Sequence, residues 1–195
     1  MNYLELAGII VGLIYIWLEY KANIWLWLAG IVMPAIYIFV YYDSGFYADM
    51  VINIYYLVAG IYGWVVWRIK GDQHDELPIT RTPKKYILPL LLVAAAAFAL
   101  IAFVLVRFTP SDVPYGDSFT TALSIVGLWM LARKYVEQWV VWIVVDLVCA
   151  VLYVYKGLYM TGALYLLYTV IAVAGYFKWI KLMKYESEEN SVTGY

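Results

Sequence analysis

The stretch GLYMTGALYLLYTVIAVAGYFKW, residues 157–179, is an almost unbroken run of apolar and aromatic side chains. A helix that crosses the hydrocarbon core of a bilayer needs about 20 mostly apolar residues, so this stretch predicts a transmembrane helix. Six other stretches have the same character and are separated by charged or turn-forming residues. The seven predicted spans are 4–19, 24–42, 47–67, 86–106, 118–131, 139–155 and 160–183.

The composition of the whole chain indicates the same class of protein. Of its 195 residues, 66% are hydrophobic and only 14% are charged. A water-soluble domain of this size has no interior large enough to bury so much apolar surface. We therefore predict an all-α polytopic membrane protein whose main surroundings are the lipid bilayer.

The same sequence argues against several functions. The net charge of −1 offers no basic surface for nucleic acid. One cysteine and one histidine form neither a disulfide nor a metal-ligand pattern. No phosphate-binding glycine loop and no pairing of nucleophile with base is visible. We expect no enzyme activity, no cofactor and no metal site.

The chain also resembles itself. A shift of 112 positions, from residue 45 to residue 157, aligns GFYADMVINIYYLVAGIYGWVVW (45–67) with the opening stretch. The identical pairs are Gly45 with Gly157, Tyr47 with Tyr159, Tyr56 with Tyr168, Gly63 with Gly175, and Trp67 with Trp179. The same shift aligns Trp27 with Trp139 and Pro34 with Asp146. This pattern predicts two triplets of helices with one helix between them.

An intervening helix gives the two triplets the same direction across the membrane, so they are predicted to be parallel repeats, an architecture typical of transporters. The predicted parts are a first repeat (1–68), a cytoplasmic loop with a connector helix at about 86–106 (together 69–117), a second repeat (118–183) and a disordered cytoplasmic tail (184–195). Of the 13 Lys and Arg residues, only Arg107 and Lys156 fall on one predicted side. The positive-inside rule then predicts an N-terminus outside and a C-terminus in the cytoplasm.

The costliest residue in the predicted spans is Asp146, because a carboxylate at mid-bilayer is expensive and normally faces the protein interior. Trp139 and Trp142 lie on the same helical stripe. One interpretation is a counter-ion for a cationic substrate whose rings stack on the tryptophans. The alternative is a protonated or hydroxyl-bonded acid that fixes helix packing.

Other polar and aromatic residues could complete a cavity around Asp146. Asn53 and Tyr56 belong to the third predicted span, and Tyr165 and Tyr168 belong to the seventh. Asn53 could equally bond to a neighbouring helix. Each of the tyrosines could also serve as a packing or interface residue.

The segment RKYVEQWVVWIVVD (133–146), with GLY at 157–159 and YADMVINIYYLVAGIYGWVVW at 47–67, resembles the PnuC family of bacterial vitamin transporters. The resemblance implies a SWEET-like fold in the bacterial inner membrane and a homotrimer. It also implies facilitated diffusion with alternating access, in which a cytoplasmic kinase phosphorylates the vitamin and so maintains uptake.

Members that carry nicotinamide riboside typically have Asn where this chain has Asp146, Gln at Asn53, and Asn at Met33 and Gly60. These four departures favour the thiamine branch, PnuT, because thiamine has a fixed thiazolium charge and an aminopyrimidine that can donate to a carboxylate. Nicotinamide riboside, which is also cationic, is the alternative. A non-transporting receptor or scaffold is an alternative of another class. The predicted substrate-binding residues are Trp139, Trp142, Asp146, Asn53, Tyr56, Tyr165, Tyr168 and Met33.

Overall fold

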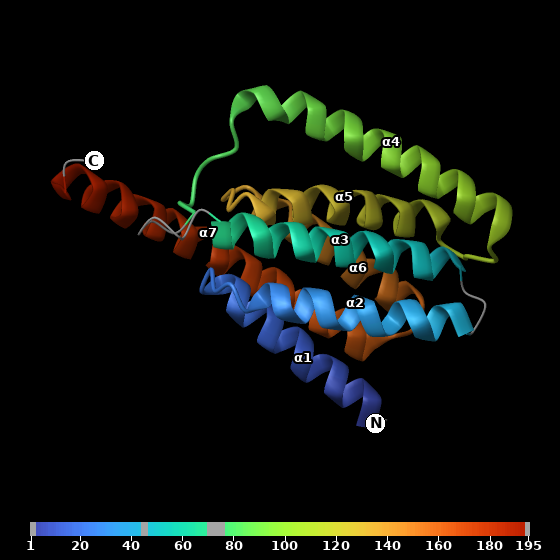
Figure 1. Cartoon of the computed structure of the whole chain (residues 1–195). Coiled ribbons are helices and arrows are strands. Elements are labelled where there is room, and N and C mark those ends of the chain that lie inside the picture. The colour runs from blue at the N-terminus through green and yellow to red at the C-terminus, as the bar shows by residue number, and fades with distance from the viewer. Residues whose placement is uncertain (1–2, 44–46, 70–76, 194–195) are drawn as a thin grey trace. The chain divides into compact units, whose positions relative to one another are not determined.

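The computed structural model describes residues 3–43, 47–69 and 77–193. Seven helices account for nearly all of these residues (Figure 1). They are α1 (Tyr3–Tyr20), α2 (Leu26–Asp43), α3 (Tyr47–Ile69), α4 (Lys84–Phe108), α5 (Pro114–Ala132), α6 (Gln138–Tyr155) and α7 (Tyr159–Thr193). The predicted all-α class is confirmed, and each predicted span corresponds to one helix.

Four described helical segments are long and apolar enough to cross a membrane: Met50–Ile69, Lys84–Phe108, Gln138–Tyr155 and Tyr159–Glu188. Two apolar helical segments are shorter, Ile10–Tyr20 and Leu26–Val40. Helix α5 belongs to neither group because its first half is rich in hydroxyl side chains. Those hydroxyls donate to backbone carbonyls one turn earlier, which satisfies them within the helix. The donors are Ser118 to Pro114, Thr120 to Gly116, and Ser124 to Thr120.

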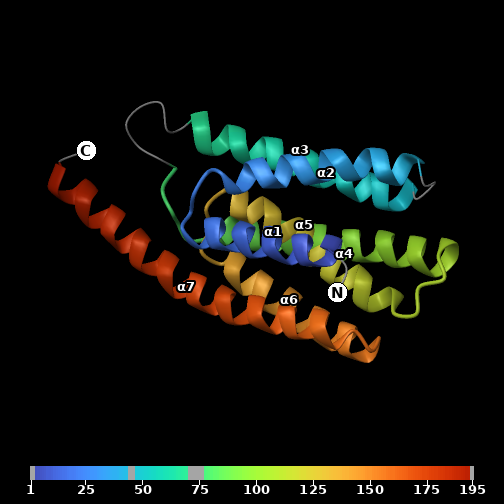
Figure 2. The ribbon, with the colours of Figure 1, turned by 90° about the horizontal axis from the view of Figure 1, so that it is seen from below.

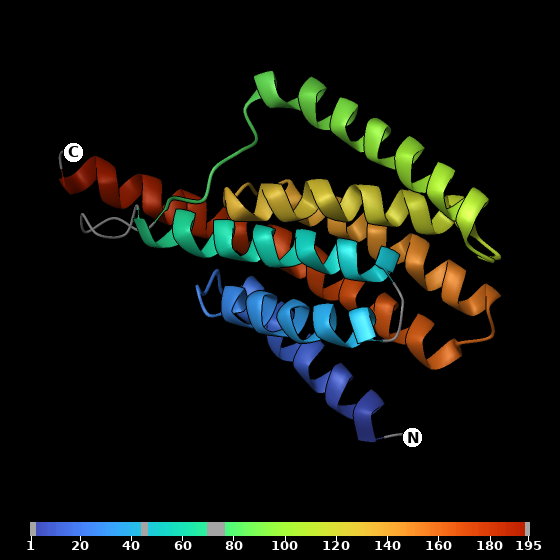
Figure 3. The ribbon, with the colours of Figure 1, turned by 45° about the vertical axis from the view of Figure 1, so that its right-hand side comes forward.

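The chain divides into two compact units, Met1–Pro78 and Ile79–Tyr195. In the first unit, α2 packs along α3 and α1 packs against α2; in the second, α6 lies between α5 and α7 (Figure 2). Helix α4 packs on α5, and the two converge toward the turn that joins them (Figure 3). Helix α4, which corresponds to the predicted connector, thus belongs to the second unit. Residues 70–76 of the predicted loop lie outside the described residues.

The turns that precede α2 and α6 have the same backbone geometry. Ala22 and Lys134, which are 112 positions apart, both have a positive φ of 51°. The backbone N–H of Ala22 donates to the carbonyl of Glu19, and that of Lys134 donates to the carbonyl of Leu131, at 2.9 Å in each case. A left-handed conformation is uncommon for residues other than glycine, so its occurrence at both turns is informative.

The two units share an almost perpendicular pair of tryptophans at equivalent positions. Trp27 of α2 meets Trp67 of α3 with ring centroids 5.6 Å apart and planes at 87°. Trp139 of α6 meets Trp179 of α7 at 5.7 Å and 90°. All four rings are buried. Edge-to-face contact is a favoured aromatic geometry, and here it joins neighbouring helices in both units.

Helix α7 is longer than the sequence predicts. It continues to Thr193, which corrects the disordered tail expected from residue 184. Part of the reason is a tertiary contact, because the backbone N–H of Ile79 donates to Oε2 of Glu186 at 2.9 Å. A hydrogen bond to a residue 107 positions away cannot be inferred from a polar composition.

The segment that leads into α4 is attached to the α5–α6 turn. The N–H of Thr80 donates to the carbonyl of Lys134 at 3.1 Å, and the N–H of Val136 donates to the carbonyl of Thr80 at 3.0 Å. Glu137 then accepts from the N–H and hydroxyl of Thr82 at 2.7 and 2.8 Å, and from Nη1 of Arg81 at 3.0 Å. We call Arg81, Thr82 and Glu137 the Glu137 clamp.

We expect Glu137→Gln to lower the stability of the folded state at neutral pH by about 1 to 2 kcal/mol. Burial acts to raise the pKa of Glu137, but hydrogen bonds from Thr82 and Arg81 outweigh it and hold the pKa below its usual range. A depressed pKa stabilises the fold above the unfolded value of about 4.3, and that contribution is lost as pH falls through the folded pKa. Thermal unfolding should therefore separate the two proteins at pH 7 and progressively less below pH of about 4.

The control for this prediction is Asp112→Asn, which removes one carboxylate at an exposed position. It should leave the unfolding temperature unchanged at both pH values. A Glu137→Gln protein that unfolds like the parent at pH 7 would show that the clamp contributes nothing to stability.

Candidate functional site

The candidate site is built on one face of α6, around Asp146. The carboxylate lies in the middle of the helix and its residue is only 6% exposed. It forms no hydrogen bond or ion pair with any residue in the described ranges. A buried charge without a partner costs free energy. Such a residue is found where a ligand or water can pair with the charge or a proton can neutralise it.

Helix α7 supplies aromatic hydroxyls to this face. Tyr165 and Tyr168 both lie within electrostatic range of Asp146. The ring of Tyr165 stacks on Tyr153 of α6, with centroids 5.1 Å apart and planes at 20°, and meets Tyr168 edge-on at 5.8 Å. The structure therefore brings three of the predicted residues together: Asp146, Tyr165 and Tyr168.

Helix α5 adds polar groups that the sequence interpretation did not include. Cys149, one turn beyond Asp146, interacts with the side chain of Thr120 and with the Asp146 carboxylate. Thr120 is buried and also donates to the carbonyl of Asp117 at 3.1 Å. The signal for Thr120 was the polar start of its span, but the sequence alone did not indicate which helix face it would occupy.

The two predicted tryptophans have different surroundings. Trp139 is fully buried, perpendicular to Trp179 and in contact with Gly175, so its ring packs the α6–α7 interface. Trp142 is half-buried, and its ring lies against Gly127 of α5, where a Cβ atom would stand 3.4 Å away. Trp142 is thus the less buried of the two tryptophans.

Gln138, at the start of α6, is a further candidate that the sequence interpretation missed. Its side chain is fully buried, and neither Oε1 nor Nε2 has a hydrogen-bond partner in the described part of the chain. The indole N–H groups of Trp139 and Trp142 are also buried without a hydrogen-bond partner among the described residues. Because glutamine next to a charged turn suggests a solvated residue, its burial could not be read from the sequence.

The other three predicted residues belong to the first unit. Asn53 and Tyr56 are half-buried on α3, and Tyr56 contacts the ring of Tyr55 edge-on at 5.8 Å. Met33 is half-buried in α2, immediately before Pro34. Their assignment to the substrate site remains a prediction.

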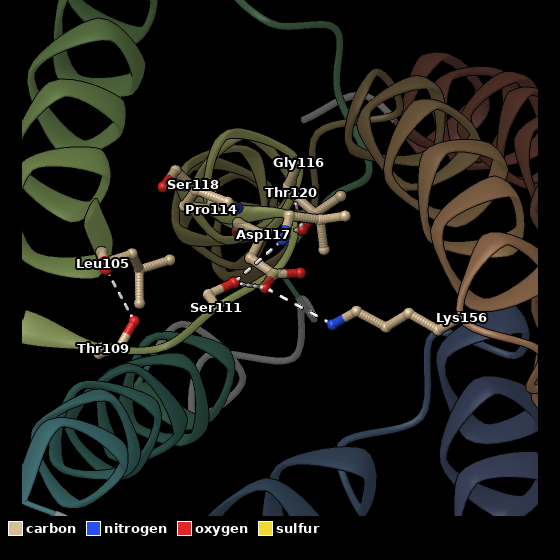
Figure 4. A network of polar contacts seen from close by, with 10 residues as sticks. Leu105, Thr109, Ser111, Pro114, Gly116, Asp117, Ser118, Thr120 and Lys156 are labelled. Atoms are coloured by element: carbon tan, nitrogen blue, oxygen red, sulfur yellow. Dashed lines mark hydrogen bonds and ion pairs between the residues drawn. The ribbon is translucent and has the colours of Figure 1, made fainter.

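A polar network joins the start of α5 to the end of α6 (Figure 4). The hydroxyl of Ser111 donates to Oδ2 of Asp117 at 3.0 Å, and Nζ of Lys156 lies 3.9 Å from the same oxygen. Both charged side chains are partly exposed, so the pair contributes little energy on its own. The network fixes the loop that enters α5, at the opposite end of α6 from Gln138.

The candidate site in the second unit has the chemistry that a bound cation requires. It combines one unpaired carboxylate, aromatic rings and a few neutral donors and acceptors. Among the described residues there is no group of three or more His, Cys, Asp or Glu side chains that could hold a metal ion. The arrangement fits a flat aromatic cation that pairs with Asp146 and stacks on Trp142.

Comparison with known proteins adds the following. Residues 2–181 match a family described as nicotinamide mononucleotide transporter. The nicotinamide riboside transporter PnuC of Escherichia coli is 26% identical over 205 residues, covering 92% of this chain and 86% of the relative. The riboflavin/roseoflavin transporter RibM of Streptomyces davaonensis is 27% identical over 183 residues, covering 90% and 83%.

A third relative, the nicotinamide riboside transporter PnuC of Neisseria mucosa, is 29% identical over 154 residues, covering 72% of this chain and 58% of the relative. Among solved structures, the crystal structure of the vitamin B3 transporter PnuC has a similar fold. The TM-score is 0.65 at 23% identity, and the match covers 90% of this chain and 80% of the other.

Proposed function

The chain belongs to the nicotinamide mononucleotide transporter family, a family of membrane transporters, and from that membership we propose that its substrate is nicotinamide riboside. The predicted resemblance to PnuC proteins is thereby confirmed at the level of the family. The sequence interpretation preferred thiamine, with nicotinamide riboside as the alternative. Two of the three relatives reported above are described as nicotinamide riboside transporters and the third carries riboflavin, so the comparisons favour the alternative.

The observation that carries the proposal is the unpaired carboxylate of Asp146 beside the aromatic side chains of α6 and α7. Nicotinamide riboside has a positively charged pyridinium ring, which can pair with Asp146 and stack on Trp142. Riboflavin offers no cation to such a site. Thiamine remains the second candidate, because its aminopyrimidine could donate to the carboxylate that this chain has in place of Asn.

The proposal also includes the architecture of the protein, its mode of transport and its oligomeric state. The equal geometry of the two turns and of the two tryptophan pairs supports parallel three-helix repeats before and after α4 in the chain, as in the SWEET architecture. Rocking of one repeat against the other would give alternating access and facilitated diffusion. The remaining elements of the proposal are a homotrimer, an N-terminus outside the cell, and a cytoplasmic kinase that traps the vitamin.

Binding and exchange experiments test this function. In titration calorimetry of the purified protein, nicotinamide riboside should bind most tightly, thiamine more weakly and riboflavin not measurably. Tight thiamine binding beside undetectable riboside binding would reverse the choice of substrate. In liposomes, counterflow of labelled riboside should occur, whereas a receptor or scaffold would bind the compound without exchanging it across the membrane.

A further inference from the structure

Gln138 has a buried side-chain amide that lacks hydrogen-bond partners in its own unit. The residue is fully buried, and both its donor and its acceptor lack a partner among the described residues. Buried polar groups in native proteins are nearly always hydrogen-bonded, and an exception calls for a specific reason such as a bound water or ligand. The equivalent position in the first unit is Leu26, which is also fully buried. An aliphatic side chain therefore packs well at such a position, and the helix start itself does not require an amide.

The position of Gln138 on α6 relates it to the candidate site. Gln138, Trp142 and Asp146 follow one another at intervals of four residues. On an α-helix this spacing keeps the three within about 80° of one face, with about 6 Å along the axis between neighbours. A ring that stacks on Trp142 thus has Asp146 toward one end and Gln138 toward the other.

We propose that Gln138 binds the carboxamide of the substrate. Its Nε2 donates to the carboxamide oxygen, and its Oε1 accepts from the carboxamide nitrogen. This reciprocal pair matches the carboxamide of nicotinamide, which offers one acceptor and one donor on the same group. The inference rests on the proposed function, and it gives the chain an amide for the carboxamide despite its departures from the family pattern at Asn53, Met33 and Gly60.

The inference is tested with two ligands that differ only in the carboxamide: nicotinamide riboside and N-ribosylpyridinium. The parent protein should bind nicotinamide riboside at least about tenfold more tightly than N-ribosylpyridinium, because a site built around a hydrogen-bonding group rejects the analogue that lacks it. Gln138→Leu should bind the two ligands with nearly equal affinity. Its thermal unfolding temperature should equal or exceed that of the parent, since the variant removes an unpaired buried amide.

Other results overturn the inference in distinguishable ways. If Gln138→Leu still discriminates between the ligands, Gln138 does not contact the carboxamide. If the variant loses affinity for both ligands equally and unfolds at a lower temperature, the amide is structural; Gln138→Met, which keeps the side-chain length, must then give the same result. If the parent binds neither ligand, the proposed function itself fails.

Discussion

Asp146→Leu is expected to abolish measurable substrate binding and uptake while leaving the protein folded. The carboxylate lies within electrostatic range of Tyr165 and Tyr168, and a desolvated cation loses its counter-charge when it is removed. Truncating one partner of a buried charge pair typically costs about 2–5 kcal/mol, which is about 30- to 4,000-fold in affinity. Calorimetry with nicotinamide riboside measures the loss.

The folding stability of Asp146→Leu should not fall below that of the parent. A charged residue at mid-bilayer costs roughly 2.5 to 3.5 kcal/mol on insertion scales, so leucine relieves a cost rather than adding one. The matched control is Val145→Leu, at the neighbouring buried position on α6, which should keep binding close to that of the parent. If Asp146→Leu binds the riboside normally, or fails to fold while Val145→Leu folds, Asp146 serves helix packing and not substrate recognition.

Asp146→Asn separates the two candidate substrates. The variant keeps a hydrogen-bonding side chain of the same size but loses the counter-charge, so riboside binding should fall, though by less than in Asp146→Leu, as expected where a neutral hydrogen bond replaces a charge-assisted one. Thiamine binding should fall much further, because its aminopyrimidine needs a carboxylate acceptor. Parallel titrations with both vitamins measure the difference.

Gly175→Val is expected to have the largest effect on stability. A Cβ atom at Gly175 would lie 2.7 Å from Cε2 of Trp139, closer than real Cβ contacts allow. The indole cannot move aside, because it is fully buried and perpendicular to Trp179. Overpacking of this kind typically costs about 1–3 kcal/mol, and a branched side chain against a rigid ring belongs at the upper end.

Thermal unfolding in detergent, followed with a thiol-reactive dye on Cys149, the single cysteine of the chain, measures this cost. Ala174→Val is the matched control, since it adds a branched side chain at the adjacent, exposed position. Unfolding of Gly175→Val at the temperature of Ala174→Val would show that the α6–α7 interface adapts and that the tryptophan contact is not tightly packed.

The seven helices and the inward position of Asp146 follow from the sequence because both depend on local properties. An apolar run inside a bilayer is expected to form a helix, since the lipid offers no partner for its backbone groups. A carboxylate within such a run must face the protein interior for a similar reason. These inferences need no knowledge of which helices are neighbours.

Only the tertiary structure decided which helices pack together and which side chains lie buried between them. It assigned α4 to the second unit, extended α7 through the contact of Glu186 with Ile79, and showed that Trp139 packs the α6–α7 interface while the ring of Trp142 lies against Gly127 of α5. It also revealed the buried amide of Gln138. Each of these properties depends on the side chains of another helix, because helical periodicity identifies a face of a helix but carries no information about what packs against it.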